Sequence, residues 1–258
     1  MTGRPRNTER SPLTERLRAD CEHCFGLCSV VPALTASSDF AIDKDAGQQV
    51  AQVTFGGRDW RQAPGTAQDM FSVFTVMRQL HELLWYLAEA RALPAAGPVH
   101  DQLDQALDEV GHLTGSEADA LIGLDTGTLR GDVSHLLRQA SELARGPGRP
   151  ETELAGADLI GKDLGRADLQ AACLRNACLI GASLQGADLR TADVLGADFR
   201  GADLSGADLS TSVFLIQSQV DAARGDAATR LPPALRRPGH WTAARAGRGG
   251  AAARRSRR

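Results

Sequence analysis

The sequence predicts a mixed fold, in which a solenoid of short repeats follows a small α-helical domain. Two patterns in the 258 residues support this prediction. Residues 151–216 place a hydrophobic side chain at every fifth position, and residues 67–146 place apolar side chains at helical spacing. The expected parts are 1–66, a partly irregular segment that contains cysteines; 67–146, the helical domain; 151–216, the repeats; 217–243, a cap; and 244–258, a disordered Arg-rich tail.

The first part of the chain carries three closely spaced thiols. Cys21, Cys24 and Cys28 stand in the segment C-E-H-C-F-G-L-C. Thiols at this spacing can converge on a zinc ion or an iron–sulfur cluster, but a tetrahedral zinc site needs four ligands. We therefore expect no cofactor, and we keep a metal held by these three cysteines as the alternative.

The second part, residues 67–146, shows three stretches of helical periodicity. These stretches predict a helical hairpin or a three-helix unit, with breaks at Pro94, at Thr114-Gly115 and in the segment GLDTGT. The periodic residues are Met70, Phe71, Phe74, Met77, Leu80, Leu84 and Leu87 in the first stretch, Leu103, Leu107, Val110 and Leu113 in the second, and Leu129, Val133, Leu136, Leu137, Ala140 and Leu143 in the third.

The third part repeats with a period of five, which fits neither a helix nor a strand alone. A short extended piece followed by a turn does fit, because the large residue and the small residue two places earlier then point inward together. An Asp usually lies between them and points outward. Glycine often stands two places after the large residue, where the chain must bend and a positive φ costs Gly little.

The segments ADLIG, ADLQA, ADLRT, ADFRG, ADLSG and ADLST make this part similar to the pentapeptide-repeat family, whose motif is A-[DN]-L-x-x. The resemblance implies a right-handed four-sided β-helix with four repeats per coil. Thirteen repeats would form a rod about 16 Å tall. Residues 20 apart then stack, and we expect repulsion among Asp168, Asp188 and Asp208 to raise their pKa values modestly.

Two outer columns of the predicted rod carry apolar residues. One contains Ile160 and Ile180, and the other contains Leu195 and Leu215. We expect these four residues to form an interaction surface that is covered by the rest of the chain or by a second copy. Lys162 takes an inward position, where an ammonium group is costly to bury, so we expect an irregular start to the rod.

The segment after the repeats resembles the end of actinobacterial pentapeptide-repeat proteins, and that resemblance implies a cap. Apolar residues that could cover the last coil are Val220, Ala222, Ala223, Leu231, Leu235 and Trp241. The Cys-containing start is similar to a subset of the same proteins. In those a second Cys-containing stretch follows the F-A-I-D-K-x-A-G segment, whereas here QQVAQVTFGG follows it without cysteine.

Charge and composition exclude several classes of function. The formal net charge of −3 combines an acidic body with a basic tail, because residues 217–258 carry 10 basic and 2 acidic side chains. We expect a cytoplasmic protein without signal peptide or membrane span. The sequence HELLW lacks the second histidine of a zinc-protease motif, and phosphate-binding and nucleophile-elbow motifs are absent from the sequence.

We therefore expect a non-enzymatic scaffold or protein–protein interaction module with an unidentified protein partner, either as a monomer or as a homodimer. One alternative is a metal- or redox-sensing protein that uses Cys21, Cys24 and Cys28. A second alternative, which the family resemblance implies, is a binder of DNA gyrase that imitates duplex DNA. The Arg-rich tail could contact nucleic acid only nonspecifically, so we expect no specific nucleic-acid partner and no membrane partner.

Overall fold

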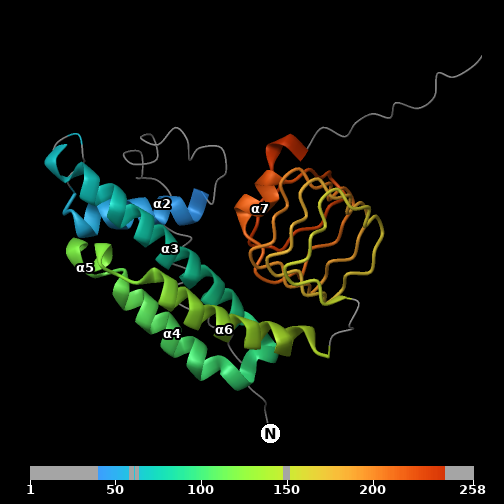
Figure 1. The fold of residues 1–258 in the computed structure, drawn as a ribbon, viewed down its shortest axis with the longest axis horizontal. Helices are drawn as coiled ribbons and strands as arrows, with labels where there is room; N and C mark the ends of the chain where they lie inside the picture. The colour runs from blue at the N-terminus through green and yellow to red at the C-terminus, as the bar shows by residue number, and fades with distance from the viewer. Residues whose placement is uncertain (1–39, 58–60, 62–63, 148–151, 242–258) are drawn as a thin grey trace, which may run out of the picture.

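A computed structural model describes residues 40–57, 61, 64–147 and 152–241. Helices built from residues 40–145 form one part of the molecule, and the repeats form a stack of coils beside them (Figure 1). The cysteines at 21, 24 and 28 and the tail at 244–258 lie outside the described residues.

The helical part is organised around one long helix, α3 (Ala67–Ala92). It packs against α2 (Phe40–Gln48), α4 (His100–Leu113), α5 (Ala118–Ile122) and α6 (Thr126–Arg145). Its buried residues recur at helical spacing, as in Met70, Val73, Met77, Leu80, Leu84 and Leu87. The three predicted periodic stretches therefore correspond to α3, α4 and α6.

Short segments separate these helices at the predicted breaks. Pro94 opens a 3-10 turn, η3 (Pro94–Val99), directly after the C-cap of α3 at Leu93. The Asp125 side chain caps α6 by accepting from the Gly127 and Thr128 N–H groups at 3.0 and 3.2 Å. The remaining short elements are η1, a π-helical segment (Gln49–Thr54), and η2 (Pro64–Thr66).

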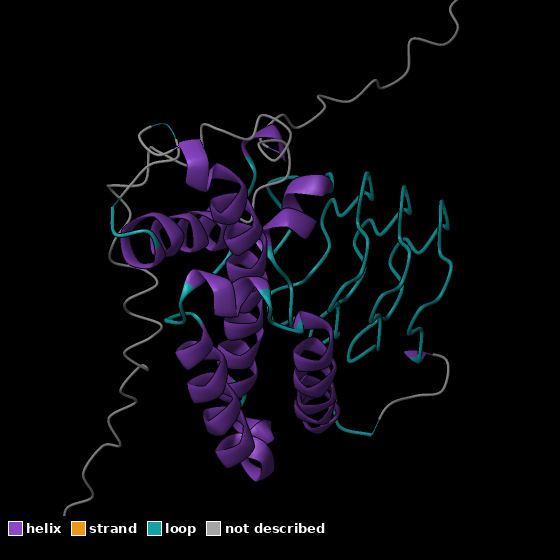
Figure 2. Ribbon diagram, turned by 60° about the vertical axis from the view of Figure 1, so that its left-hand side comes forward, coloured by secondary structure: helices purple, strands orange, loops and turns teal. Residues whose placement is uncertain are grey.

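The repeats form coils of 20 residues, so that four repeats make one turn of the solenoid. Parallel single-residue bridges join positions 20 apart, for example Asp168 to Asp188 and Asp188 to Asp208. Because each side of a coil contributes one bridge residue, Figure 2 shows the solenoid as stacked loops and not as strand arrows. The backbone ladder is regular: Leu189 N–H donates to Asp208 O at 2.8 Å.

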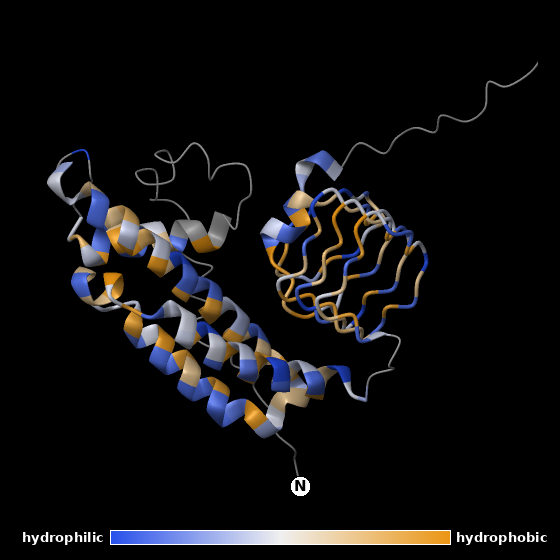
Figure 3. Cartoon of the chain, viewed as in Figure 1, coloured by the Kyte–Doolittle hydropathy of each residue, from blue (hydrophilic) through white to orange (hydrophobic). Residues whose placement is uncertain are grey.

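The solenoid interior is filled by its own large and small residues. Leu169, Leu189 and Leu209 form one buried ladder, while Leu179 and Phe199 belong to a second. Figure 3 shows the hydrophobic positions recurring in orange around the coils. Close packing of this kind leaves the interior as a core and gives it no room for a substrate.

The first coil is regular, which corrects the expectation of an irregular start. Glu153, Asp158 and Asp163 each bridge to the coil above, and Ser183 N–H donates to Lys162 O at 2.8 Å. Lys162 is exposed, so its ammonium group avoids the cost of burial. The inward residue Leu164 of this coil is only half-buried.

The turn position two places after the large residue is left-handed along most of the solenoid. The glycines there have φ between 63° and 69°, and Arg166, Ala171, Asn176 and Thr191 adopt φ of 54–59° at the same position. Glycine is the residue that this conformation costs least. The turn therefore lies where the five-residue period predicts it, two places after the large inward residue.

The end of the solenoid is closed by the segment that follows the repeats. Arg224 bridges to Asp203 and Arg230 bridges to Asp208, so the chain continues two sides of a fourth coil. Trp241, in η5 (Gly239–Trp241), is buried and packs into the solenoid core, where its indole N–H donates to Ala223 O at 3.0 Å. Gly225 leaves room for this ring, because a Cβ there would lie 2.6 Å from it.

Polar side chains complete the cap. The Gln219 amide, on α7 (Gln217–Ala222), donates to Val194 O and Ala197 O at 2.9 and 2.8 Å. The Thr229 hydroxyl donates to Leu204 O at 2.9 Å. The Gln219 bond satisfies Ala197 O, whose counterpart Ala177 O accepts from the next coil, while Val194 O and Leu204 O gain a second donor.

Candidate interaction surface

The outward aspartates of the repeats organise the corners of the coil. Each accepts, through Oδ1, from the backbone N–H two residues later at 3.0–3.2 Å. This Asx-type turn bends the chain between one side of the coil and the next. The aspartates are Asp158, Asp163, Asp168, Asp188, Asp193, Asp198, Asp203 and Asp208.

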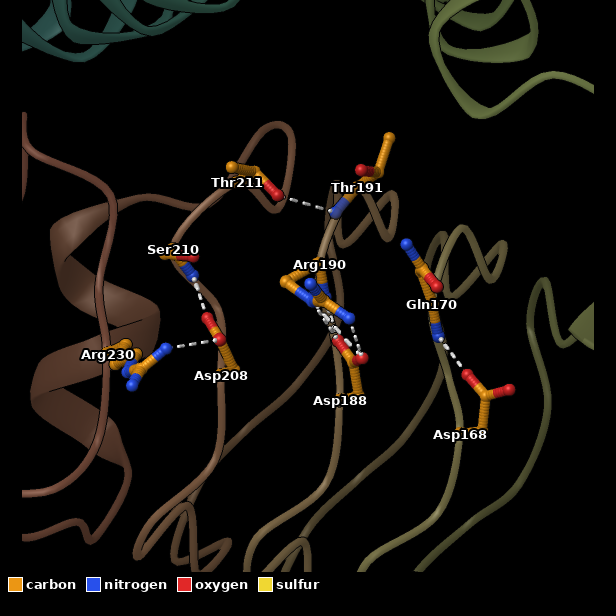
Figure 4. Close-up of polar contacts among 9 residues, drawn as sticks. All are labelled: Asp168, Gln170, Asp188, Arg190, Thr191, Asp208, Ser210, Thr211 and Arg230. Atoms are coloured by element: carbon orange, nitrogen blue, oxygen red, sulfur yellow. Dashed lines mark hydrogen bonds and ion pairs between the residues drawn. The ribbon is translucent and has the colours of Figure 1, made fainter.

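One exposed side of the solenoid carries Asp168, Asp188 and Asp208 (Figure 4). Arg190 forms a two-pronged ion pair with Asp188, with nitrogen–oxygen distances of 2.6 and 2.9 Å. Arg230 from the cap reaches Asp208 at 3.3 Å. Part of the negative charge on this side is thereby offset.

The predicted rise of the pKa values is wrong for Asp188 and Asp208. Hydrogen bonds from Arg190 lower the pKa of Asp188, against a smaller effect of desolvation. At Asp208, desolvation acts to raise the pKa, but hydrogen bonds from Ser210 together with the charge of Arg230 outweigh it and lower the pKa. Nearby donors therefore matter more than repulsion between stacked carboxylates.

The opposite side, two repeats away in the four-repeat coil, carries the apolar column of Ile160 and Ile180. Ile160 is 55% exposed, and Ile180 is half-buried. Above them Arg200 makes a two-pronged pair with Asp198, at 2.6 and 3.0 Å. This side therefore presents isoleucine side chains next to a fixed guanidinium–carboxylate pair.

The side with the second apolar column is covered by the helices. Leu215 is 3% exposed, and Leu195 packs against the hydrophobic cluster of the helical part. Phe214 and Ile216 belong to that same cluster. Leu195 thus lies at a junction within the chain, which is one of the two coverings that the sequence left open, whereas Leu215 is buried in the hydrophobic cluster of the solenoid itself.

Buried polar contacts reinforce this junction. The Phe214 N–H donates to Glu89 Oε1 of α3 at 2.8 Å, and the Tyr86 ring meets the Phe214 ring edge-on at 6.0 Å. Arg175 lies over the same ring at 5.6 Å and forms an ion pair with Asp193, which is wholly buried. Arg145 at the end of α6 pairs with Glu153 at 2.9 Å.

Glu89, Arg175 and Asp193 do not stand out in the sequence. Glu89 lies within a helical pattern, and Asp193 occupies an ordinary repeat position. Arg175 also gives no signal, because Arg190 and Arg200 stand at the equivalent position of other repeats.

The predicted metal ligands Cys21, Cys24 and Cys28 lie outside the described residues. Within the part of the chain that the structure describes, no group of three or more His, Cys, Asp or Glu residues could hold a metal ion. Cys173 and Cys178 are free thiols, and burial raises the pKa of Cys173. None of the described helices is long and apolar enough to cross a membrane.

The fold and its surface define a repeat protein with a β-helix solenoid and an N-terminal helical part. The family model for pentapeptide repeats matches residues 151–186 and 177–214. The chain is also 48% identical over 264 aligned positions to the uncharacterized protein YybG of Bacillus subtilis, and the alignment covers 87% of this chain and 95% of that protein. The chain belongs to the pentapeptide-repeat family.

Two solved structures share the repeat. One is a pentapeptide-repeat protein from the thylakoid lumen of Arabidopsis thaliana, with 30% identity, a TM-score of 0.21, and 34% of this chain and 66% of that chain covered. The other is a pentapeptide-repeat protein of the cyanobacterium Cyanothece 51142, with 32% identity, a TM-score of 0.18, and 31% and 60% covered.

Proposed function

We propose that this protein is a non-enzymatic interaction module in the cytoplasm, and that its solenoid is the right-handed, four-sided β-helix implied by the family resemblance. The helical part holds one side of the solenoid, and a protein partner binds a side that remains exposed. The binding side we propose is the one with Ile160 and Ile180.

The observation that supports this most is the difference in solvent exposure between the two apolar columns. Leu195 packs against the helices and Leu215 is buried in the solenoid core, whereas Ile160 remains 55% exposed on a rigid backbone. An exposed aliphatic side chain flanked by fixed charges is typical of the centre and rim of a protein interface. The filled core of the solenoid is consistent with a scaffold.

The test compares two arginine substitutions at equivalent repeat positions. Ile160→Arg alters the proposed binding side, and Gln170→Arg places the same charge on the side with Asp168. The immobilised full chain and both variants are used to capture proteins from the native cytoplasm. Size-exclusion chromatography with light scattering measures whether a second copy is the partner.

We expect Ile160→Arg to abolish capture of the partner protein or, if the partner is a second copy, to abolish the dimer. Gln170→Arg should leave both unchanged. Retention with both variants would contradict the proposed surface. Turnover of a metabolite by the purified protein in an unbiased activity screen would contradict the non-enzymatic function.

A further inference from the structure

Phe214 is the last large inward residue of the solenoid. Its N–H lacks the carbonyl acceptor that a following coil provides to the equivalent residues. One coil earlier, Val194 N–H donates to Val213 O of the next coil at 3.1 Å. Phe214 has no such coil after it, because the chain enters α7 at Gln217. Its φ is +63°, and its N–H donates to the Glu89 side chain at 2.8 Å. Glu89 therefore stands where the carbonyl of a further coil would be.

The surroundings of Glu89 favour a carboxyl group that carries a proton. The charged group that acts on it from the solenoid is Asp193, which is wholly buried and is itself paired with the Nε of Arg175. Arg145 from α6 is engaged at the first coil, by Glu153 and by Ala171 O at 3.1 Å. Because Asp193 and Arg175 offset each other, an ionised Glu89 would add an unpaired negative charge.

We propose that Glu89 is a proton-controlled clasp between α3 and the solenoid: the carboxyl group holds α3 on the coil end while it is protonated, and ionisation loosens that contact. A protonated Glu89 still accepts from Phe214 N–H through one oxygen. An ionised Glu89 is stabilised by water once α3 separates from the coil. The clasp concerns the junction within the chain and does not depend on the proposed binding side.

The electrostatics agree with this geometry. Burial raises the pKa of Glu89 from 4.5 to about 8; the Phe214 hydrogen bond opposes this rise, and the charge of Asp193 adds to it. At a pH between 4.5 and about 8, Glu89 is ionised when α3 is separated from the coil and protonated when α3 is docked. Docking therefore weakens as pH rises from 4.5 to about 8 and changes no further above 8. One pKa unit corresponds to a tenfold change in the opening constant.

The experiment measures hydrogen–deuterium exchange of the Phe214 amide in the full chain from pH 5 to 9.5, corrected for the intrinsic exchange rate. We expect the opening constant to rise about tenfold per pH unit up to about pH 8 and then to level off. The matched variant Glu89→Gln keeps an oxygen acceptor and cannot ionise, so its opening constant should stay flat across this range.

Equal pH dependence in the wild type and in Glu89→Gln would overturn the proposal. A second measurement covers the case in which Glu89→Gln does not fold. In wild-type protein labelled with carbon-13 at the glutamate carboxyl groups, one signal should titrate near pH 8. If every glutamate titrates below pH 6, the proposal is wrong.

Discussion

Two aspartate–arginine pairs use the same repeat positions on different sides of the solenoid, although Asp188 pairs within its own repeat and Asp193 pairs with an arginine of the preceding coil. Asp188 and Arg190 lie on an exposed side, with side chains that are 31% and 46% exposed. Asp193 and Arg175 lie under the helices, where the aspartate is wholly buried. Both aspartates make the same turn, by accepting from the N–H two residues later at 3.1 and 3.0 Å.

The difference shows that the repeat motif determines the turn, and that the surroundings determine what the charge contributes. On the exposed side water solvates both partners, so an ion pair contributes little to stability. Under the helices each charge depends on the other, because the Asp193 side chain is wholly buried and the Arg175 side chain is only 10% exposed. Arg175 also retains one buried nitrogen without a hydrogen-bond partner in the described structure, which makes its pairing with Asp193 more important.

Asp193→Ala should have the largest effect on stability. The substitution leaves the Arg175 guanidinium buried and unpaired, and breaking a buried pair typically costs about 3–5 kcal/mol. Urea unfolding followed by circular dichroism measures the change. Asp188→Ala is the matched control, since it removes the same turn contact on the exposed side. Equal losses for the two variants would remove the distinction between the two sides.

A pH titration in acid tests the helical part separately from the solenoid. Burial lowers the pKa of His81, on α3, from 6.5 to about 4. Between these values the unfolded chain binds a proton at His81 that the folded chain does not, so His81 should lower stability by about 1.4 kcal/mol per unit as pH drops from 6.5 to 4. Glu89 contributes with the opposite sign between pH 4.5 and 8, so the slope is compared between the wild type and a variant that retains Glu89. His81→Leu should reduce that slope in urea unfolding. An unchanged slope would contradict the assignment.

Gln219→Ala tests the end of the solenoid. Its side chain donates to Val194 O and Ala197 O and accepts from Ile216 N–H at 3.0 Å. Leaving Ala197 O and Ile216 N–H without this partner should cost about 1–3 kcal/mol in the free energy of unfolding. Gln185→Ala removes an exposed glutamine that donates to Asp203, and it serves as the control. Similar effects of the two substitutions would count against the capping role of Gln219.

Arg190→Ala should have the smallest effect. The Arg190 side chain is 46% exposed to solvent. Its ion-pair partner among the described residues is Asp188. We expect no change in the urea midpoint beyond experimental error, in low or in high salt. A clear loss of stability would show that the exposed ladder supports the fold.

The sequence was sufficient to predict the solenoid because its determinants are local. The five-residue period places Leu189 inward, Asp188 outward and the turn after them, and the observed coil follows that register. The three long helices likewise follow from the spacing of residues such as Leu80 and Leu103.

The junction could not be predicted in the same way. Glu89 and Phe214 are 125 residues apart, and their contact depends on which side of the solenoid turns toward α3. No local period encodes that choice. The pKa of Asp188 was misjudged for a related reason, because the position of the Arg190 side chain decides it.

Double-mutant cycles test the central claim most directly, namely that burial under the helices makes one of two equivalent pairs essential. Arg175 and Asp193 are replaced singly and together by alanine, and so are Arg190 and Asp188. We predict a coupling energy of about 2–3 kcal/mol for the buried pair and none beyond error for the exposed pair. Equal coupling in the two cycles would contradict this account.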